Sequence, residues 1–157
     1  MCKFYLIAVL LVLATLIYGQ NDPMSYLKKE NLENYIGSKK AVLEKVIPVD
    51  YPGKESKRGK NKDGEELLYV NIGDKDIVVF CFQKNEICEK YNIYCYNFDY
   101  LNPVIKYLDD LCAKKTFVSP DLTIYTYYGR TGDYAIDLLK DKDYFVVTVH
   151  SIFYVKQ

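Results

Sequence analysis

The stretch that decides the fold lies between residues 67 and 83 and reads LLYVNIGDKDIVVFCFQ. Two runs rich in β-branched and aromatic residues, 67–72 and 77–83, flank the polar sequence Gly73-Asp74-Lys75-Asp76. Two such runs around a short glycine-containing connection are typical of a β-hairpin. The sequence therefore predicts an antiparallel sheet that contains this hairpin.

Three further segments, 91–98, 122–128 and 145–155, have the composition or the alternation of strands. In the last one, apolar residues share one face and more polar residues share the other, which indicates a sheet with one face in the core. The apolar face holds Phe145, Val147, Val149, Phe153 and Val155, and the other holds Tyr144, Thr148, His150 and Tyr154.

Helices are predicted where an Asp or Asn that can cap a helix precedes a proline. Asp22-Pro23 begins a helix over 23–36, which Gly37 ends, and Asn102-Pro103 begins another. In this second helix Val104, Leu108 and Cys112 lie on one apolar stripe that faces the core. We also expect a short helix from Asp133 to about Lys140, whereas 38–49 fits either a helix or a first strand.

These elements mix helices and strands without a regular βαβ alternation, so we predict an α+β fold with a mainly antiparallel sheet. An N-terminal helix and one or two further helices pack on it. Between them, 48–66 is polar and rich in glycine and lysine, and it contains the dibasic pair Lys57-Arg58. It is expected to form a long, exposed and flexible loop.

The first nineteen residues have the pattern of a secretory signal peptide. Lys3 precedes the apolar run Phe4 to Tyr18, and Gly19 provides a small residue for cleavage. The run is shorter than the roughly twenty residues of a membrane-spanning helix, so no membrane anchor is expected. We predict a single secreted domain, 20–157, with an extracellular location.

Cleavage would leave an even set of cysteines, Cys81, Cys88, Cys95 and Cys112, in an oxidising compartment. Such a set predicts two disulfides. Counting alone cannot separate the three pairings. The predicted elements favour Cys81 with Cys112, as a bridge from strand to helix, and Cys88 with Cys95 across a small loop.

Composition and motifs exclude several classes of binding partner. A formal net charge of zero gives no reason to expect nucleic acid. The cysteine spacing lacks the CxxC pairs of a zinc site, and no phosphate-binding or dinucleotide-binding motif is present, so neither a metal nor a cofactor is expected. An extracellular protein or a small ligand remains as the partner, and the sequence does not set the oligomeric state.

The sequence offers few candidate catalytic residues. His150 is the only imidazole, and its neighbour Ser151 would point to the opposite face of a strand. The densest carboxylates, Asp109-Asp110 and 141–143, are expected on the solvated surface. We therefore predict that the protein is not an enzyme.

Tyrosine is the compositional excess, with seventeen residues and no tryptophan. One of the two arginines lies in the turn sequence 128–134, YGRTGDY, flanked by tyrosines. Arg and Tyr are enriched among residues that dominate protein interfaces. The predicted binding residues are Tyr125, Tyr127, Tyr128, Arg130 and Tyr134.

The leading hypothesis is a secreted, disulfide-stabilised binding protein of the effector, inhibitor, toxin or ligand-carrier type, which acts by surface recognition. Two alternatives stay open. One is a small secreted hydrolase that uses carboxylates, and the other is a tyrosine-rich structural or matrix protein.

Overall fold

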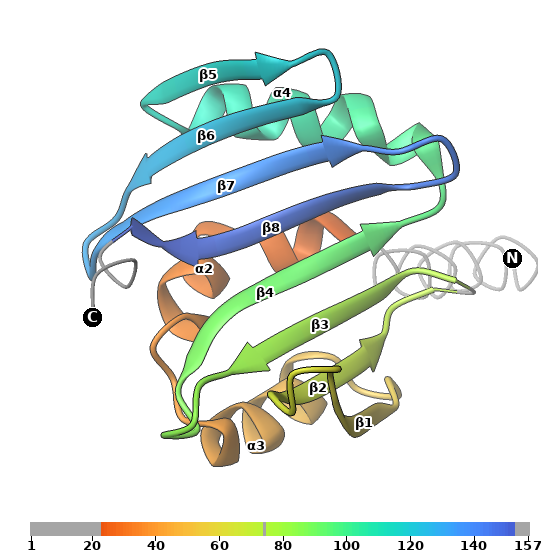
Figure 1. Ribbon diagram of the computed structural model, residues 1–157, viewed down its shortest axis with the longest axis vertical. Helices are drawn as coiled ribbons and strands as arrows, with labels where there is room; N and C mark the ends of the chain where they lie inside the picture. Colours follow the sequence, from red (N-terminus) through yellow and green to blue (C-terminus); the bar gives the residue numbers. More distant parts are fainter. Residues whose placement is uncertain (1–22, 74, 153–157) are drawn as a thin grey trace, which may run out of the picture.

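Eight strands form one antiparallel sheet in residues 23–73 and 75–152, the part of the chain that the computed structural model describes (Figure 1). Their order across the sheet is β1-β2-β3-β4-β8-β7-β6-β5. The strands are β1 (Ser56–Lys60), β2 (Glu66–Asn71), β3 (Ile77–Phe82), β4 (Cys88–Cys95), β5 (Lys114–Ser119), β6 (Leu122–Tyr128), β7 (Asp133–Lys140) and β8 (Phe145–Ser151).

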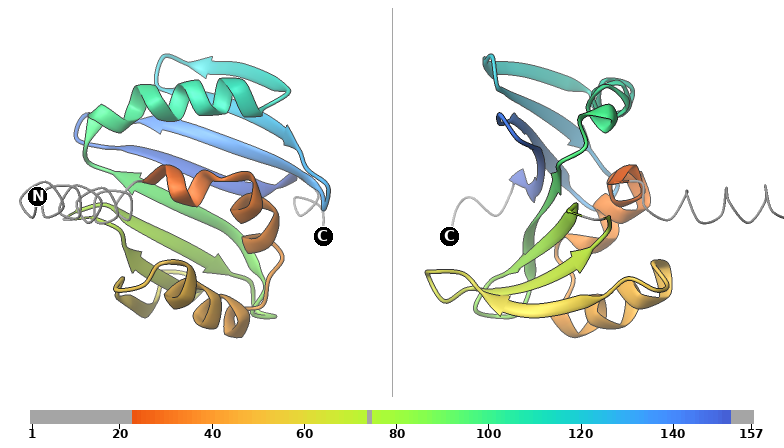
Figure 2. Two further views of the ribbon diagram at one scale, coloured as in Figure 1. Left: turned by 180° about the vertical axis from the view of Figure 1, so that it is seen from behind. Right: turned by 90° about the vertical axis from the view of Figure 1, so that its right-hand side faces the viewer.

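The helices all lie on the same face of this sheet. Figure 2 shows α4, α2 and α3 in front of the strands in one view and to one side of them in the other. The helical segments are η1 (Pro23–Leu27), α2 (Lys29–Tyr35), α3 (Lys40–Asp50), η2 (Phe98–Tyr100) and α4 (Leu101–Leu111). The opposite face of the sheet carries no helix of the described chain.

The architecture repeats itself. Each half of the described chain is a helical segment followed by four strands that pair with their sequence neighbours, β1 to β4 and then β5 to β8. The last strand of each half, β4 or β8, pairs with the other at the centre of the sheet. The first strands, β1 and β5, therefore form its two edges.

Aromatic side chains from the sheet and the helices build the main core. The rings of Phe80 and Tyr91 lie against Tyr35 of α2, with ring centroids 5.3 and 5.7 Å from it. Tyr91 is fully buried and donates its hydroxyl to the carbonyl of Tyr26 at 3.0 Å. Its polar end is thereby satisfied inside the core, as a buried tyrosine requires.

The α+β class and the mainly antiparallel sheet are confirmed. The hairpin 67–83 corresponds to β2 and β3, and the helix after Asn102 to α4, which buries Val104 and Leu108. The predicted helix 23–36 is divided into η1 and α2, and the segment 38–49, left open between helix and strand, is helical from Lys40 onward, in α3. The signal sequence 1–19 and the end of the last predicted strand, 153–155, lie outside the described residues.

The helix predicted from Asp133 to about Lys140 is wrong, because these residues form β7. Tyr134, Ile136 and Leu138 are buried at alternate positions, and β7 pairs with β6 on one side and β8 on the other. Interpreting Asp133 as a helix cap overlooked this alternation. The ladders on both sides satisfy the backbone of β7, so the central position decides its conformation.

The irregular loop predicted over 48–66 is wrong at its ends, where 48–50 belong to α3 and Glu66 to β2. It is also wrong for residues 56–60, which form the edge strand β1. These residues are polar and almost entirely exposed, so no apolar alternation indicated a strand. Pairing with β2 holds them in place, and Arg58 donates two hydrogen bonds, of 2.6 and 2.8 Å, to the carboxylate of Glu44 on α3. The flexibility of this segment stays a prediction.

The two predicted disulfides are wrong, because none of the four described cysteines is in a disulfide. Cys88 and Cys95 stand at opposite ends of β4, and seven residues of strand span roughly 23 Å, whereas bridged Cα atoms lie within about 7 Å. Cys81 packs with Leu67 and Val79 on the face without helices, while Cys112 packs against the main core. The sheet therefore separates Cys81 from Cys112.

Candidate functional site

The turn between β6 and β7 lies among the predicted binding residues. Gly129 donates its N–H to the carbonyl of Gly132 at 2.9 Å, which closes the turn. A Cβ at Gly129 would lie 2.9 Å from the ring of Tyr134 and 3.0 Å from that of Tyr127, so only glycine fits here. The two rings stack under the turn with centroids 5.9 Å apart.

Glu33 of α2 fastens this turn to the helical layer. Its side chain is only 7% exposed, and its Oε1 accepts the hydroxyl of Tyr127 at 2.8 Å and the backbone N–H of Arg130 at 3.1 Å. Burial, followed by the hydrogen bond to Glu33, raises the pKa of Tyr127 well above its usual range. Hydrogen bonds to an ionised carboxylate are stronger than neutral ones, so the turn and the helix act as one unit.

The side chains that this unit displays are Tyr128 and Arg130. Tyr128 is 60% exposed, and the side chain of Arg130 is 87% exposed, with its Nε 3.8 Å from Oε2 of Glu33. Beside Arg130 lies a polar pocket of about 300 Å³, whose walls come from Glu30, Glu33, Asn34 and Arg130. This volume is at the lower end of the range for small-ligand pockets.

The five predicted binding residues therefore separate into two groups. Tyr125, Tyr127 and Tyr134 are almost fully buried on the helix-covered face, whereas Tyr128 and Arg130 are exposed. The buried three can support a binding surface but cannot contact a partner directly. Their part in binding stays a prediction.

Sequence reasoning missed Glu33. It lies ninety-four residues before Tyr127, and neither a motif nor a regular spacing connects the two. The weak signal available was the predicted N-terminal helix itself, which had to pack somewhere on the sheet.

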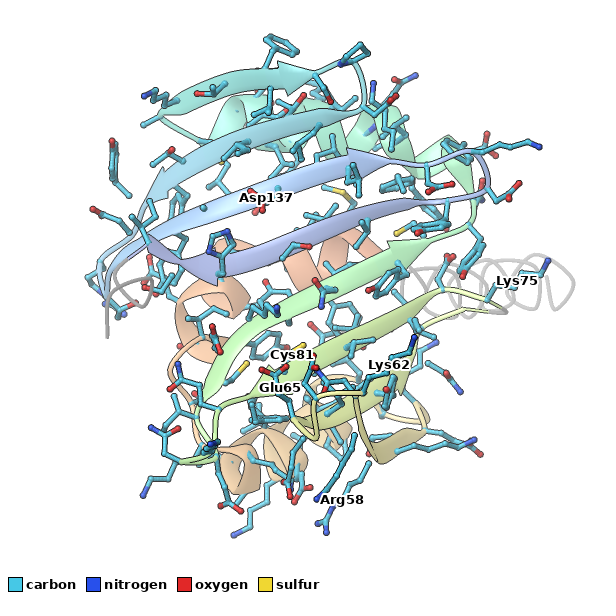
Figure 3. All side chains as sticks on the ribbon, in the orientation of Figure 1. Arg58, Lys62, Glu65, Lys75, Cys81 and Asp137 are labelled. Atoms are coloured by element: carbon cyan, nitrogen blue, oxygen red, sulfur yellow. The ribbon has the colours of Figure 1, made fainter. Side chains whose placement is uncertain are left out.

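The face without helices is a second surface with distinctive chemistry. Leu67, Val79 and Cys81 form a small buried cluster on it, with Tyr69 and Tyr94 packed against them. Figure 3 shows the β1–β2 connection, with Lys62 and Glu65 labelled, next to Cys81 on this face. Burial is the main cause that raises the pKa of the Cys81 thiol, so this residue is a weak nucleophile at neutral pH.

Polar side chains cross the middle of the same face. Asn92 accepts a hydrogen bond from Thr148 at 2.8 Å and donates one to the sulfur of Cys81 at 3.6 Å. On the neighbouring strands, Nε2 of His150 lies 3.4 Å from Oδ2 of Asp137. The hydrogen bond to Asp137 raises the pKa of His150, against the opposing effect of burial.

These groups do not form a pair of nucleophile and base. Cys81 and His150 are both aligned with Lys90, on opposite sides of β4, so their backbones are two strands and about 10 Å apart. Ser151 is buried, whereas His150 stands on the other face of β8. The observed contacts make His150 a partner of a carboxylate rather than of a thiol or a hydroxyl.

Within the described residues, no group of three or more His, Cys, Asp or Glu side chains is arranged to hold a metal ion. No helix of this part of the chain is long and apolar enough to cross a membrane.

Comparison with protein-family models, curated proteins and solved structures gives no significant match. The candidate site therefore rests on the geometry of this chain.

Proposed function

We propose that this protein is a secreted, non-enzymatic binding protein that recognises its partner through the turn between β6 and β7. The recognition surface consists of Tyr128, Arg130 and the pocket beside Arg130, formed with Glu30, Glu33 and Asn34. Export rests on the leader pattern of residues 1–19.

The observation that carries this proposal is the way Glu33 holds the turn. A buried carboxylate accepts hydrogen bonds from Tyr127 and from the backbone of Arg130, and the side chains of Tyr128 and Arg130 still extend into solvent. A preorganised turn loses little conformational freedom on binding, which favours affinity. Tyr and Arg are also the residue types that most often dominate an interface.

An extracellular protein is the partner that this surface fits best. The pocket presents the exposed carboxylate of Glu30 beside an exposed guanidinium, so it can receive a basic side chain while Arg130 pairs with an acidic one. Oppositely charged groups close together give specificity and orientation rather than raw affinity.

The test is an affinity capture with the purified mature chain from the fluid into which it is secreted, repeated with Arg130→Ala and Tyr128→Ala. Truncating a central contact typically costs about 2 kcal/mol or more, which is roughly a thirtyfold loss of affinity. Arg58→Ala is the matched control, because Arg58 is the other arginine and its side chain is also exposed, at 72%, but on β1.

A partner retained by the wild type and by Arg58→Ala, and lost by the two turn variants, supports the proposal. A partner that binds all four proteins equally would place recognition elsewhere. Loss of activity only in His150→Gln, with folding intact, would favour catalysis instead.

A further inference from the structure

We propose that β5 is a dimerisation strand, which pairs antiparallel with β5 of a second copy of this chain. The product is a closed twofold dimer in which two eight-stranded sheets join into one of sixteen strands. This inference is independent of the function proposed for the Arg130 turn.

The first observation is the exposure of β5. All six of its residues are exposed, including two large apolar side chains, Phe117 at 74% and Val118 at 57%. As an edge strand it pairs with β6 alone, so its outer backbone N–H and C=O groups are not used in the sheet. An exposed edge of this kind is a template for another strand.

The second observation is that the opposite edge is protected. Three of the five residues of β1 are basic, namely Lys57, Arg58 and Lys60. Lysines and other charges on an edge strand are a recognised protection against pairing with a second chain. β5 also carries two lysines, Lys114 and Lys115, but of the two edges it alone displays large exposed apolar side chains, so it is the edge better suited to association.

The difference between the two edge strands determines which strand can pair with β5. Pairing of β5 with β1 of the next copy would continue without end and produce a filament, whereas pairing of β5 with β5 closes after two copies. With β1 protected, the closed arrangement is the one the edges permit. A second copy is also acceptable electrostatically, because the formal net charge of the chain is zero.

The residues of β5 suit antiparallel self-pairing. A twofold axis places the end of the strand with Lys114 and Lys115 opposite the end with Phe117 and Val118 of the other copy, so the lysines do not face each other directly. Lys115 is already paired with Asp109 of α4 at 2.7 Å. The regular ladder with β6 covers Lys114 to Phe117 and shifts register after Phe117, so the new pairing is short.

A short pairing predicts a reversible, concentration-dependent dimer. Sedimentation velocity of the mature chain over a wide range of concentrations should show a monomer–dimer equilibrium. Phe117→Lys should raise the dimer dissociation constant about tenfold or more, because the twofold places the substitution in the interface twice.

Val49→Lys is the matched control, since Val49 is an equally exposed apolar residue, at 77%, on α3. It should dimerise like the wild type. Circular dichroism checks that both variants fold, and hydrogen exchange supplies a second readout. Protection of the β5 amides should rise with protein concentration, while protection of the β1 amides should not.

The proposal fails if the wild type is monomeric at every concentration and the β5 amides exchange independently of concentration. In that case β5 would be free for a strand from a different protein. It also fails if Phe117→Lys and Val49→Lys dimerise equally well, because the interface would then lie elsewhere.

Discussion

At the scale of single residues, the hydrogen bond between Glu33 and Tyr127 helps to hold the turn of the candidate site in place. Tyr127→Phe removes one of the donors to a buried carboxylate and leaves the ring in place. We expect the free energy of unfolding to fall by about 1.5 to 3 kcal/mol, the usual range for a hydrogen bond to a charged group. Urea unfolding measures this loss.

Tyr128→Phe is the control for this substitution, since Tyr128 is adjacent but 60% exposed. Its free energy of unfolding should stay within about 0.5 kcal/mol of the wild type. Equal losses in the two variants would mean that the hydroxyl of Tyr127 has no special role in stability.

His150 gives the protein a defined pH dependence. Its hydrogen bond to Asp137 raises its pKa above the ordinary value of about 6.5. A raised pKa in the folded state means that the contribution to stability is complete below about pH 6.5 and is lost as the pH rises through the folded value. The wild type should therefore lose free energy of unfolding over this interval, and Asp137→Asn should lose less.

Because His150 is the only histidine, its imidazole signals in an NMR titration report this pKa without ambiguity. Asp133→Asn is the control, as it changes a carboxylate on the same strand at a position that pairs with Tyr128 instead. If the pKa of His150 were the same in the wild type and in Asp137→Asn, the pairing with Asp137 would not be what raises it.

At the scale of elements, the sequence was informative where side chains alternate or repeat and uninformative where neighbours decide. The hairpin of β2 and β3 and the apolar stripe of α4 carry their own patterns, and both were predicted. β7 carries a local alternation of Tyr134, Ile136 and Leu138, which the interpretation of Asp133 as a helix cap overlooked. β1 has no such pattern and is a strand because β2 pairs with it. This pairing is not encoded locally, and neither is the position of Glu33 under a turn ninety-four residues from it in sequence.

The two edge strands, β1 and β5, should be the least stable strands of the sheet, since their side chains are almost all exposed. Trypsin should cut first at Lys57-Arg58 on β1, because these side chains are 71% and 72% exposed, whereas Lys115 on β5 is 31% exposed. Glu44→Gln weakens the pair that ties Arg58 to α3, and an exposed pair of good geometry is worth about 0.5 to 1 kcal/mol. If cleavage follows local opening, the rate should rise roughly two- to fivefold.

Mass spectrometry of the early fragments measures this rate. Asp110→Asn breaks a comparable exposed pair with Lys106 on α4 and should leave cleavage at β1 unchanged. A first cut outside 48–66, or equal rates in Glu44→Gln and the wild type, would contradict the expected weakness of β1.

At the scale of the whole molecule, the two halves share one core, and the seam between β4 and β8 joins them. Ile93 and Val147 are cross-strand partners at this seam and are both fully buried in the main hydrophobic cluster. That cluster runs through the strands of both halves, from Leu68 on β2 to Leu138 on β7. Neither half can therefore lose its fold without exposing apolar surface of the other, so unfolding should be one cooperative transition.

Three substitutions test this, one in each half and one at the seam. Val70→Ala lies on β2, Ile136→Ala on β7 and Ile93→Ala on β4, and all three side chains are fully buried. Ile93→Ala and Ile136→Ala should cost about 2 to 5 kcal/mol each, and Val70→Ala somewhat less, because each leaves a cavity in a packed core. Far-UV and near-UV circular dichroism should report the same midpoint for each variant. Two transitions, with Val70→Ala moving one and Ile136→Ala the other, would mean that each half folds by itself and that the pairing of β4 with β8 only docks them.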